Sequence, residues 1–188
     1  MIRMRQLIPV LALLALAACS GKSVWAPDEA IAAAAYVAVD EPPSLTLVTV
    51  INNGNGSGGH SALVINAHQK VVFDPAGNFK TPQAPERNDL VYGMYPEMLA
   101  AYYGFHARKE WHVVTQRIVV TPEIAELAFQ SAKNYGAVPS AYCASSVSAI
   151  LSGIPGFEHI TRSMSPKRLM RDFAELPGVT TDKIYEDD

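Results

Sequence analysis

The feature that most constrains the fold of this chain is a series of short apolar runs joined by polar turns. β-Branched and apolar residues dominate each run, a composition that predicts β-strands. The first three runs follow one another so closely that only antiparallel pairing can connect them. The predicted strands are residues 45–51 (LTLVTVI), 60–65 (HSALVI), 71–73 (VVF) and, later in the chain, 111–120 (WHVVTQRIVV).

Helical segments flank and follow these strands. The clearest one has Thr121 as a side-chain cap, Pro122 at the first helical position and Gly136 as its stop. Further helices are predicted from 139 to 153, from 165 to 177, over 96–103 and within 28–39, whereas residues 78–95 are expected to form a long loop. The sequence therefore predicts an α+β domain in which an antiparallel sheet packs against helices.

Composition limits the classes of function that this chain can have. The 188 residues suffice for one domain, and 49% hydrophobic with 18% charged residues can form a buried core. The net charge of −3 argues against a nucleic-acid partner, because nucleic-acid-binding proteins are normally basic. Two cysteines are too few for a disulfide framework, and the sequence has no zinc-type spacing of Cys or His. We therefore expect no metal and no other cofactor.

The N-terminus has the form of a secretory signal. Arg3 and Arg5 precede an apolar run, 7–18, that is too short to cross a bilayer. Residues 16–19 (LAAC) resemble the bacterial lipobox, in which the cysteine is diacylated and becomes the new N-terminus. That resemblance implies a lipid anchor on Cys19, and the serine after it implies the outer membrane, with the domain facing the periplasm.

These observations divide the chain into four parts. Residues 1–18 are the predicted lipoprotein signal peptide, and 19–44 are the lipid anchor and tether. Residues 45–180 form the predicted domain, and 181–188 an acidic tail. Removal of the signal leaves Cys19 for lipid and Cys143 as the remaining free thiol of an exported chain.

Cys143 is the candidate nucleophile. With Ser140 as the helix cap, Cys143 would occupy the third helical position, where unpaired N–H groups and the helix dipole favour a thiolate. His60 opens a predicted strand after a glycine-rich turn and is the candidate general base. The alternative is structural, because Cys143 also falls on the apolar face of its helix and His60 would then be a surface residue.

The order of these elements resembles a known family. A His strand, a hairpin, a further strand, a capped helix and then a Cys helix resemble the circularly permuted NlpC-like proteins, a branch of the papain-like hydrolases. The resemblance covers roughly residues 45–170 and implies a papain-like fold with His60 before Cys143. It also implies a third polar residue that orients the imidazole. Asp74 is the candidate for this role, His68 is its rival, and Tyr142 is a candidate for the substrate wall.

Three functions follow from these residues. The NlpC-like resemblance implies a cysteine hydrolase of the cell envelope that cleaves amide bonds, most naturally in peptidoglycan stem peptides. A lipid acyltransferase or thioesterase would use the same Cys143–His60 pair, and a non-catalytic envelope lipoprotein would leave Cys143 inert. The expected partners are the membrane, through the lipid on Cys19, and peptidoglycan. The sequence predicts no oligomeric state.

Overall fold

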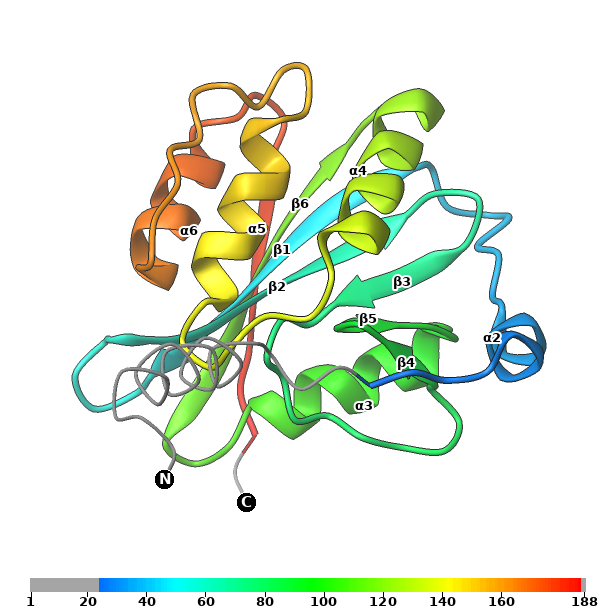
Figure 1. Cartoon of the computed structure of the whole chain (residues 1–188). Helices are drawn as coiled ribbons and strands as arrows, with labels where there is room; N and C mark the ends of the chain where they lie inside the picture. Colours follow the sequence, from blue (N-terminus) through cyan, green and yellow to red (C-terminus); the bar gives the residue numbers. More distant parts are fainter. Residues whose placement is uncertain (1–23, 187–188) are drawn as a thin grey trace, which may run out of the picture.

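The computed structural model describes residues 24–186 and combines one sheet with helices on both of its faces (Figure 1). The predicted signal at 1–18 and the predicted lipid site at Cys19 lie outside the described residues. Within 24–186, no helix has both the length and the apolar character needed to cross a membrane.

Seven strands form the sheet in the order β4-β5-β3-β2-β1-β6-β7, and every neighbouring pair is antiparallel. The four strands expected from the sequence correspond to β1, β2, β3 and β6, so the prediction of an antiparallel α+β fold is confirmed. The strands are β1 (Ser44–Asn52), β2 (Gly58–Asn66), β3 (Lys70–Phe73), β4 (Glu86–Arg87), β5 (Leu90–Val91), β6 (Trp111–Val119) and β7 (Thr180–Ile184).

Five helices occur in the described part of the chain. Three of them, α4, α5 and α6, cover one face of the sheet, and α3 packs on the other (Figure 1). The predicted cap of α4 is confirmed, because the Thr121 hydroxyl accepts a hydrogen bond from the Ile124 N–H. The helices are α2 (Asp28–Ala34), α3 (Pro96–His106), α4 (Pro122–Tyr135), α5 (Cys143–Ser152) and α6 (Pro166–Ala174).

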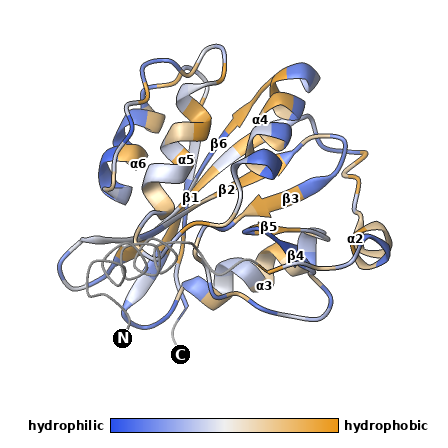
Figure 2. Ribbon diagram, viewed as in Figure 1, coloured by the Kyte–Doolittle hydropathy of each residue, from blue (hydrophilic) through white to orange (hydrophobic). Residues whose placement is uncertain are grey.

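The sheet divides the core into two halves. Successive side chains of a strand point to opposite faces, so Leu63 packs with α4, α5 and α6, whereas Ala62 and Val64 pack with α3. Figure 2 shows the apolar residues concentrated in the central strands and the polar ones on the outer turns of α4 and α6. His60 follows the same alternation as Ala62 and therefore projects from the face that α3 covers.

Three local expectations were wrong. The helix of Cys143 is capped by Tyr142 rather than by Ser140, because Ala141 takes a left-handed conformation (φ 72°) that interrupts any earlier start. Cys143 is consequently the first helical residue and not the third. Helix α3 continues past Gly104 to His106, and residues 78–95 contain β4 and β5 instead of forming a loop alone.

Both predicted ends of the domain also differ from the structure. Residues 181–184 of the predicted acidic tail are not free but belong to β7, which pairs with β6 from Arg117 to Val113. On the N-terminal side, residues 24–44 are not a free tether from Val24 onward. The Ala26 N–H donates to the Glu86 carbonyl at 2.9 Å, and the Asn88 N–H donates to the Val24 carbonyl at 2.9 Å.

Candidate active site

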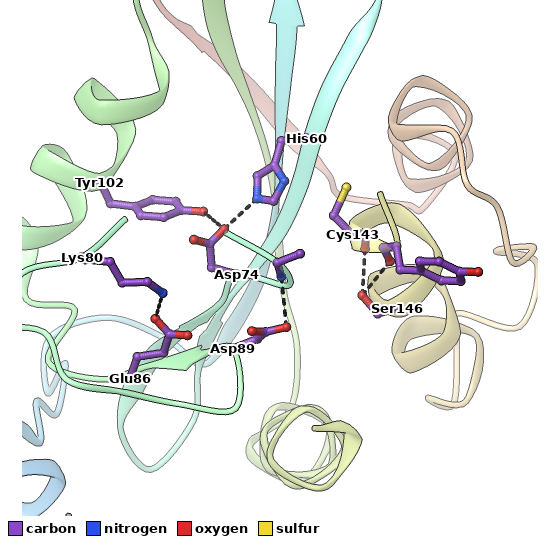
Figure 3. Close-up of polar contacts among 10 residues, drawn as sticks. His60, Asp74, Lys80, Glu86, Asp89, Tyr102, Cys143 and Ser146 are labelled. Atoms are coloured by element: carbon purple, nitrogen blue, oxygen red, sulfur yellow. Dashed lines mark hydrogen bonds and ion pairs between the residues drawn. The ribbon is translucent and has the colours of Figure 1, made fainter. Parts of the chain in front are cut away.

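Three elements bring the predicted Cys143, His60 and Asp74 together (Figure 3). His60 lies near the start of β2, Asp74 directly follows β3, and Cys143 begins α5. The pairing of β3 with β2 ends at Leu63, so the first part of β2 extends beyond its neighbour. Asp74 approaches His60 in this region, and Figure 3 shows the Cys143 sulfur pointing toward the His60 ring.

Asp74 fixes the orientation of the imidazole. The His60 Nε2 and the Asp74 Oδ1 lie 2.7 Å apart, and the Tyr102 hydroxyl donates to the same oxygen at 2.8 Å. Asp74 is only 3% exposed, so its charge acts in a poorly solvated environment. Because an ionised carboxylate only accepts hydrogen bonds, Nε2 carries a proton and Nδ1 remains for the thiol.

The electrostatics favour an ion pair between Cys143 and His60. Burial would raise the pKa of the Cys143 thiol, but the hydrogen bond and the charge of His60, with the N–H groups of Ser61 and Ala144, lower it overall. Burial would likewise lower the pKa of His60, but the Asp74 carboxylate and the Cys143 sulfur together raise it to about 10. Both shifts favour a proton on the ring and a thiolate on Cys143, which is the reactive form of cysteine.

At the Asp74 carboxyl group as well, burial acts against the hydrogen bond to His60 and the charge of the His60 ring. Burial would raise the pKa of Asp74, but its hydrogen bond to His60 and the charge of that ring lower it overall. Asp74 is therefore ionised when His60 is protonated, which makes it suitable for stabilising an imidazolium.

The two other residues singled out from the sequence lie differently. His68 sits in the β2–β3 turn, where its Nδ1 lies 2.7 Å from the Glu126 carboxylate. The structure therefore makes Asp74, and not its rival His68, the hydrogen-bond partner of His60. Tyr142 is 49% exposed and directly precedes Cys143, and its carbonyl accepts from the Ser146 hydroxyl at 3.0 Å.

Two residues of α3 were not identified as part of this site from the sequence. Tyr102 hydrogen-bonds to Asp74, and the ring of His106 lies 5.4 Å from that of His60, centroid to centroid, with 17° between the planes. Their separation of four residues places both side chains on one face of the helix. That spacing was the available signal, but nothing in the sequence directs this face toward His60.

A pocket of about 260 Å³ opens beside His60 on the α3 side. It is lined by Val50, Gly59, His60, Asn78, Phe105, His106, Arg108 and Trp111. Cys143 is not among these residues and is 8% exposed. The pocket therefore borders the imidazole of His60 but is not lined by the Cys143 sulfur.

One group of side chains within the described residues has the composition of a metal site. His60, Asp74 and His106 each offer a ligand atom, and these three atoms lie within 4.8 Å of one another. The sequence predicted no metal, because the three residues come from β2, the end of β3 and α3 and show no local spacing pattern.

The arrangement contains the parts needed for acyl transfer. Cys143 can act as the nucleophile, His60 as the proton carrier and Asp74 as the group that orients it. As the first residue of α5, Cys143 has a backbone N–H without an acceptor inside the helix, as an oxyanion requires. No family model, curated protein or solved structure matches this chain.

Replacing Asp74 with asparagine will raise the pKa of the Cys143 thiol, because the protonated His60 loses its counter-charge. In the wild type, the rate of Cys143 alkylation by iodoacetamide should rise with pH around a midpoint below the ordinary thiol value of about 8.5. In Asp74→Asn this midpoint should move upward. The matched control is Glu126→Gln, which alters the exposed pair with His68. Equal midpoints in Asp74→Asn and the wild type would contradict the role of Asp74.

The turn between β4 and β5 connects the loop that carries Asp74 with the loop that precedes Cys143. The Asp74 N–H donates to the Asp89 carbonyl at 2.7 Å. The Asp89 carboxylate then accepts from the Ala76 N–H at 3.0 Å and from the Val138 N–H at 2.9 Å. Ala76 follows Asp74, and Val138 precedes the Cys143 helix. Asp89 therefore holds the loop of the orienting acid and the loop of the nucleophile together.

Replacing Asp89 with alanine will lower the free energy of unfolding by about 1–3 kcal/mol, because two N–H groups lose their common acceptor. Alanine is also strained at the left-handed backbone conformation of Asp89, whose φ is 64°. Asp89→Asn is the matched control, since asparagine retains an acceptor and tolerates this conformation. Urea denaturation measures the difference. Equal losses in both variants would exclude these hydrogen bonds as the cause.

Proposed function

We propose that the protein is an envelope-anchored cysteine hydrolase that cleaves amide bonds, with peptidoglycan stem peptides as its substrate class. The observation that carries the proposal is the hydrogen-bonded series Cys143–His60–Asp74. A cysteine that served only as core packing would have no need of a buried imidazole and carboxylate aligned behind it. This series supports the enzyme over the non-catalytic lipoprotein.

The proposed fold assignment is a permuted NlpC-like domain of the papain-like type. It is supported by the order of elements, in which the His60 strand β2 precedes the Cys143 helix α5. The helix begins at the nucleophile and packs on an antiparallel sheet. The proposed lipid on Cys19 would hold this domain at the outer membrane, facing the periplasm.

The proposed reaction has two stages. The Cys143 thiolate attacks the carbonyl carbon of the amide, and the imidazolium of His60 gives its proton to the departing amine. A water molecule then attacks the carbonyl carbon of the resulting thioester while His60 takes a proton from that water. The acid is released, and the pair of Cys143 thiolate and His60 imidazolium is restored. The N–H of Cys143 would stabilise the oxyanion of each stage.

The size of the pocket favours amides over long lipid chains. Its volume of about 260 Å³ is below the roughly 300–1,000 Å³ of sites that enclose a whole small ligand. Val50, Phe105 and Trp111 give it an apolar lining, which suits one side chain of a peptide. A lipid acyltransferase or thioesterase would need room for an acyl chain next to His60.

The test is turnover on two substrate panels. The full-length protein in detergent is incubated with purified peptidoglycan fragments and, separately, with lipid acyl donors and thioesters, and the products are identified by mass spectrometry. We expect cleaved stem peptides from the wild type and none from Cys143→Ala. Transfer or hydrolysis of lipid acyl groups alone would favour the acyltransferase. Turnover on neither panel, with Cys143 reactive toward thiol reagents, would contradict the hydrolase.

A further inference from the structure

The histidine and carboxylate ligands around His60 have a geometry that suits a bound ion. Ligand atoms of His60, Asp74 and His106 lie within 4.8 Å of one another, and the two imidazole centroids are 5.4 Å apart. Tetrahedral zinc at 2.0–2.1 Å from two ring nitrogens would place the centroids about 5 Å apart. The two rings are near-parallel, with 17° between their planes, so they would have to rotate for all three groups to contact one ion.

His106 supplies an independent reason for a ligand here. Its Nε2 is buried and has no hydrogen-bond partner within the described part of the chain. A buried polar atom left without a partner is costly. Asp74, by contrast, has a second partner besides His60, because the Tyr102 hydroxyl donates to it. Such outer hydrogen bonds are typical of carboxylates that bind metals.

We propose that His60, Asp74 and His106 bind a divalent transition-metal ion of the zinc type, and that the bound ion stops His60 from accepting protons during turnover. Two imidazoles and one carboxylate are ligands that zinc prefers. The pocket lined by both histidines gives an ion access to them. Arg108 also lines this pocket and repels cations, so direct ligation must supply the affinity.

The inhibitory step follows from the chemistry of imidazole. A neutral ring has one nitrogen with a lone pair and one with a proton. When the lone pair of His60 binds the ion, the other nitrogen can only donate, so it cannot accept a proton from a thiol or from water. Metal binding and proton acceptance therefore exclude each other at His60, whereas the remaining N–H can still donate to the Cys143 thiolate. This regulatory half rests on the proposed cysteine chemistry, whereas the binding half does not.

Calorimetric titration of Zn²⁺ into full-length Cys143→Ser protein tests the binding half without the thiol. We expect one site per chain, and an affinity at least about tenfold weaker in Cys143→Ser combined with His106→Ala or His106→Gln. Cys143→Ser combined with His68→Gln is the matched control and should retain the site, because His68 lies in the β2–β3 turn with Glu126. Circular dichroism confirms folding of each protein. Failure to bind, or equal binding after loss of His106, would overturn the site.

Hydrolysis of purified peptidoglycan fragments in the presence and absence of Zn²⁺ tests the regulatory half. In the wild type, the ion should slow hydrolysis at least about tenfold, and a chelator should restore the rate. In His106→Gln, the ratio of the two rates should approach one. Binding without slower hydrolysis would overturn regulation. Absence of hydrolysis even without metal would instead contradict the proposed function, while the titration would still decide the metal site.

Discussion

Replacing His60 with alanine will lower turnover by about 100- to 10,000-fold, the usual contribution of a positioned acid–base group. The same change will slow iodoacetamide alkylation of Cys143 at pH 7 at least about tenfold, because an ordinary thiol is only a few per cent ionised at that pH. The reason is that the ring of His60 lowers the pKa of Cys143 by hydrogen bonding and by charge. Alkylation reports on the thiol itself and so requires no knowledge of the substrate.

The control for this prediction is another histidine of the same sheet. His112 lies on β6, where its Nδ1 is 2.7 Å from the Asn53 side-chain oxygen. His112→Ala should leave the alkylation rate of Cys143 at the wild-type value. If His60→Ala and the wild type were alkylated at the same rate, His60 would have no part in activating the thiol.

Replacing Phe173 with alanine will lower the free energy of unfolding by about 3–5 kcal/mol. Phe173 is fully buried in α6, and its ring lies 6.1 Å from that of Phe157. Both belong to the half of the core that also contains Ala144 and Val147 of the Cys143 helix. The loss combines the transfer of apolar surface to water with a cavity that the neighbouring strands can only partly fill.

Urea denaturation with a matched variant measures this effect. Phe173→Leu retains most of the buried volume and should lose clearly less stability than Phe173→Ala. A loss below about 1 kcal/mol in Phe173→Ala, with an unchanged dependence on urea, would mean that α6 contributes little to the core. In that case the support of the Cys143 helix would come from α4 and from β2.

The parts of the fold predicted correctly are those determined by local sequence. The apolar run that forms β1 and the cap-and-proline pair that begins α4 carry their own signals. β7 has no such signal, because it is an edge strand with mostly exposed residues, and its pairing with β6 is a tertiary event. The two-residue strands β4 and β5 are too short for any periodicity to appear.

The same distinction applies to the candidate site. Cys143, His60 and Asp74 were selected because each stands at the end of a recognisable element, and the structure brings them together. Tyr102 and His106 were missed as members because their position depends on how α3 packs against the sheet. The start of α5 was misplaced because the left-handed conformation of Ala141 has no signal in its residue type.

The attachment of residues 24–28 to the β4–β5 turn has a mechanical consequence. If Cys19 carries lipid as proposed, only residues 20–23 connect it to the described fold, and an extended chain spans at most about 3.5 Å per residue. The lipid would then keep the domain close to the membrane surface, and the domain would diffuse only along that surface. The same turn carries Asp89, which joins the Asp74 and Cys143 loops. A force on the lipid would therefore be transmitted to the β4–β5 turn. Through Asp89, this turn is hydrogen-bonded to the loop that precedes Cys143.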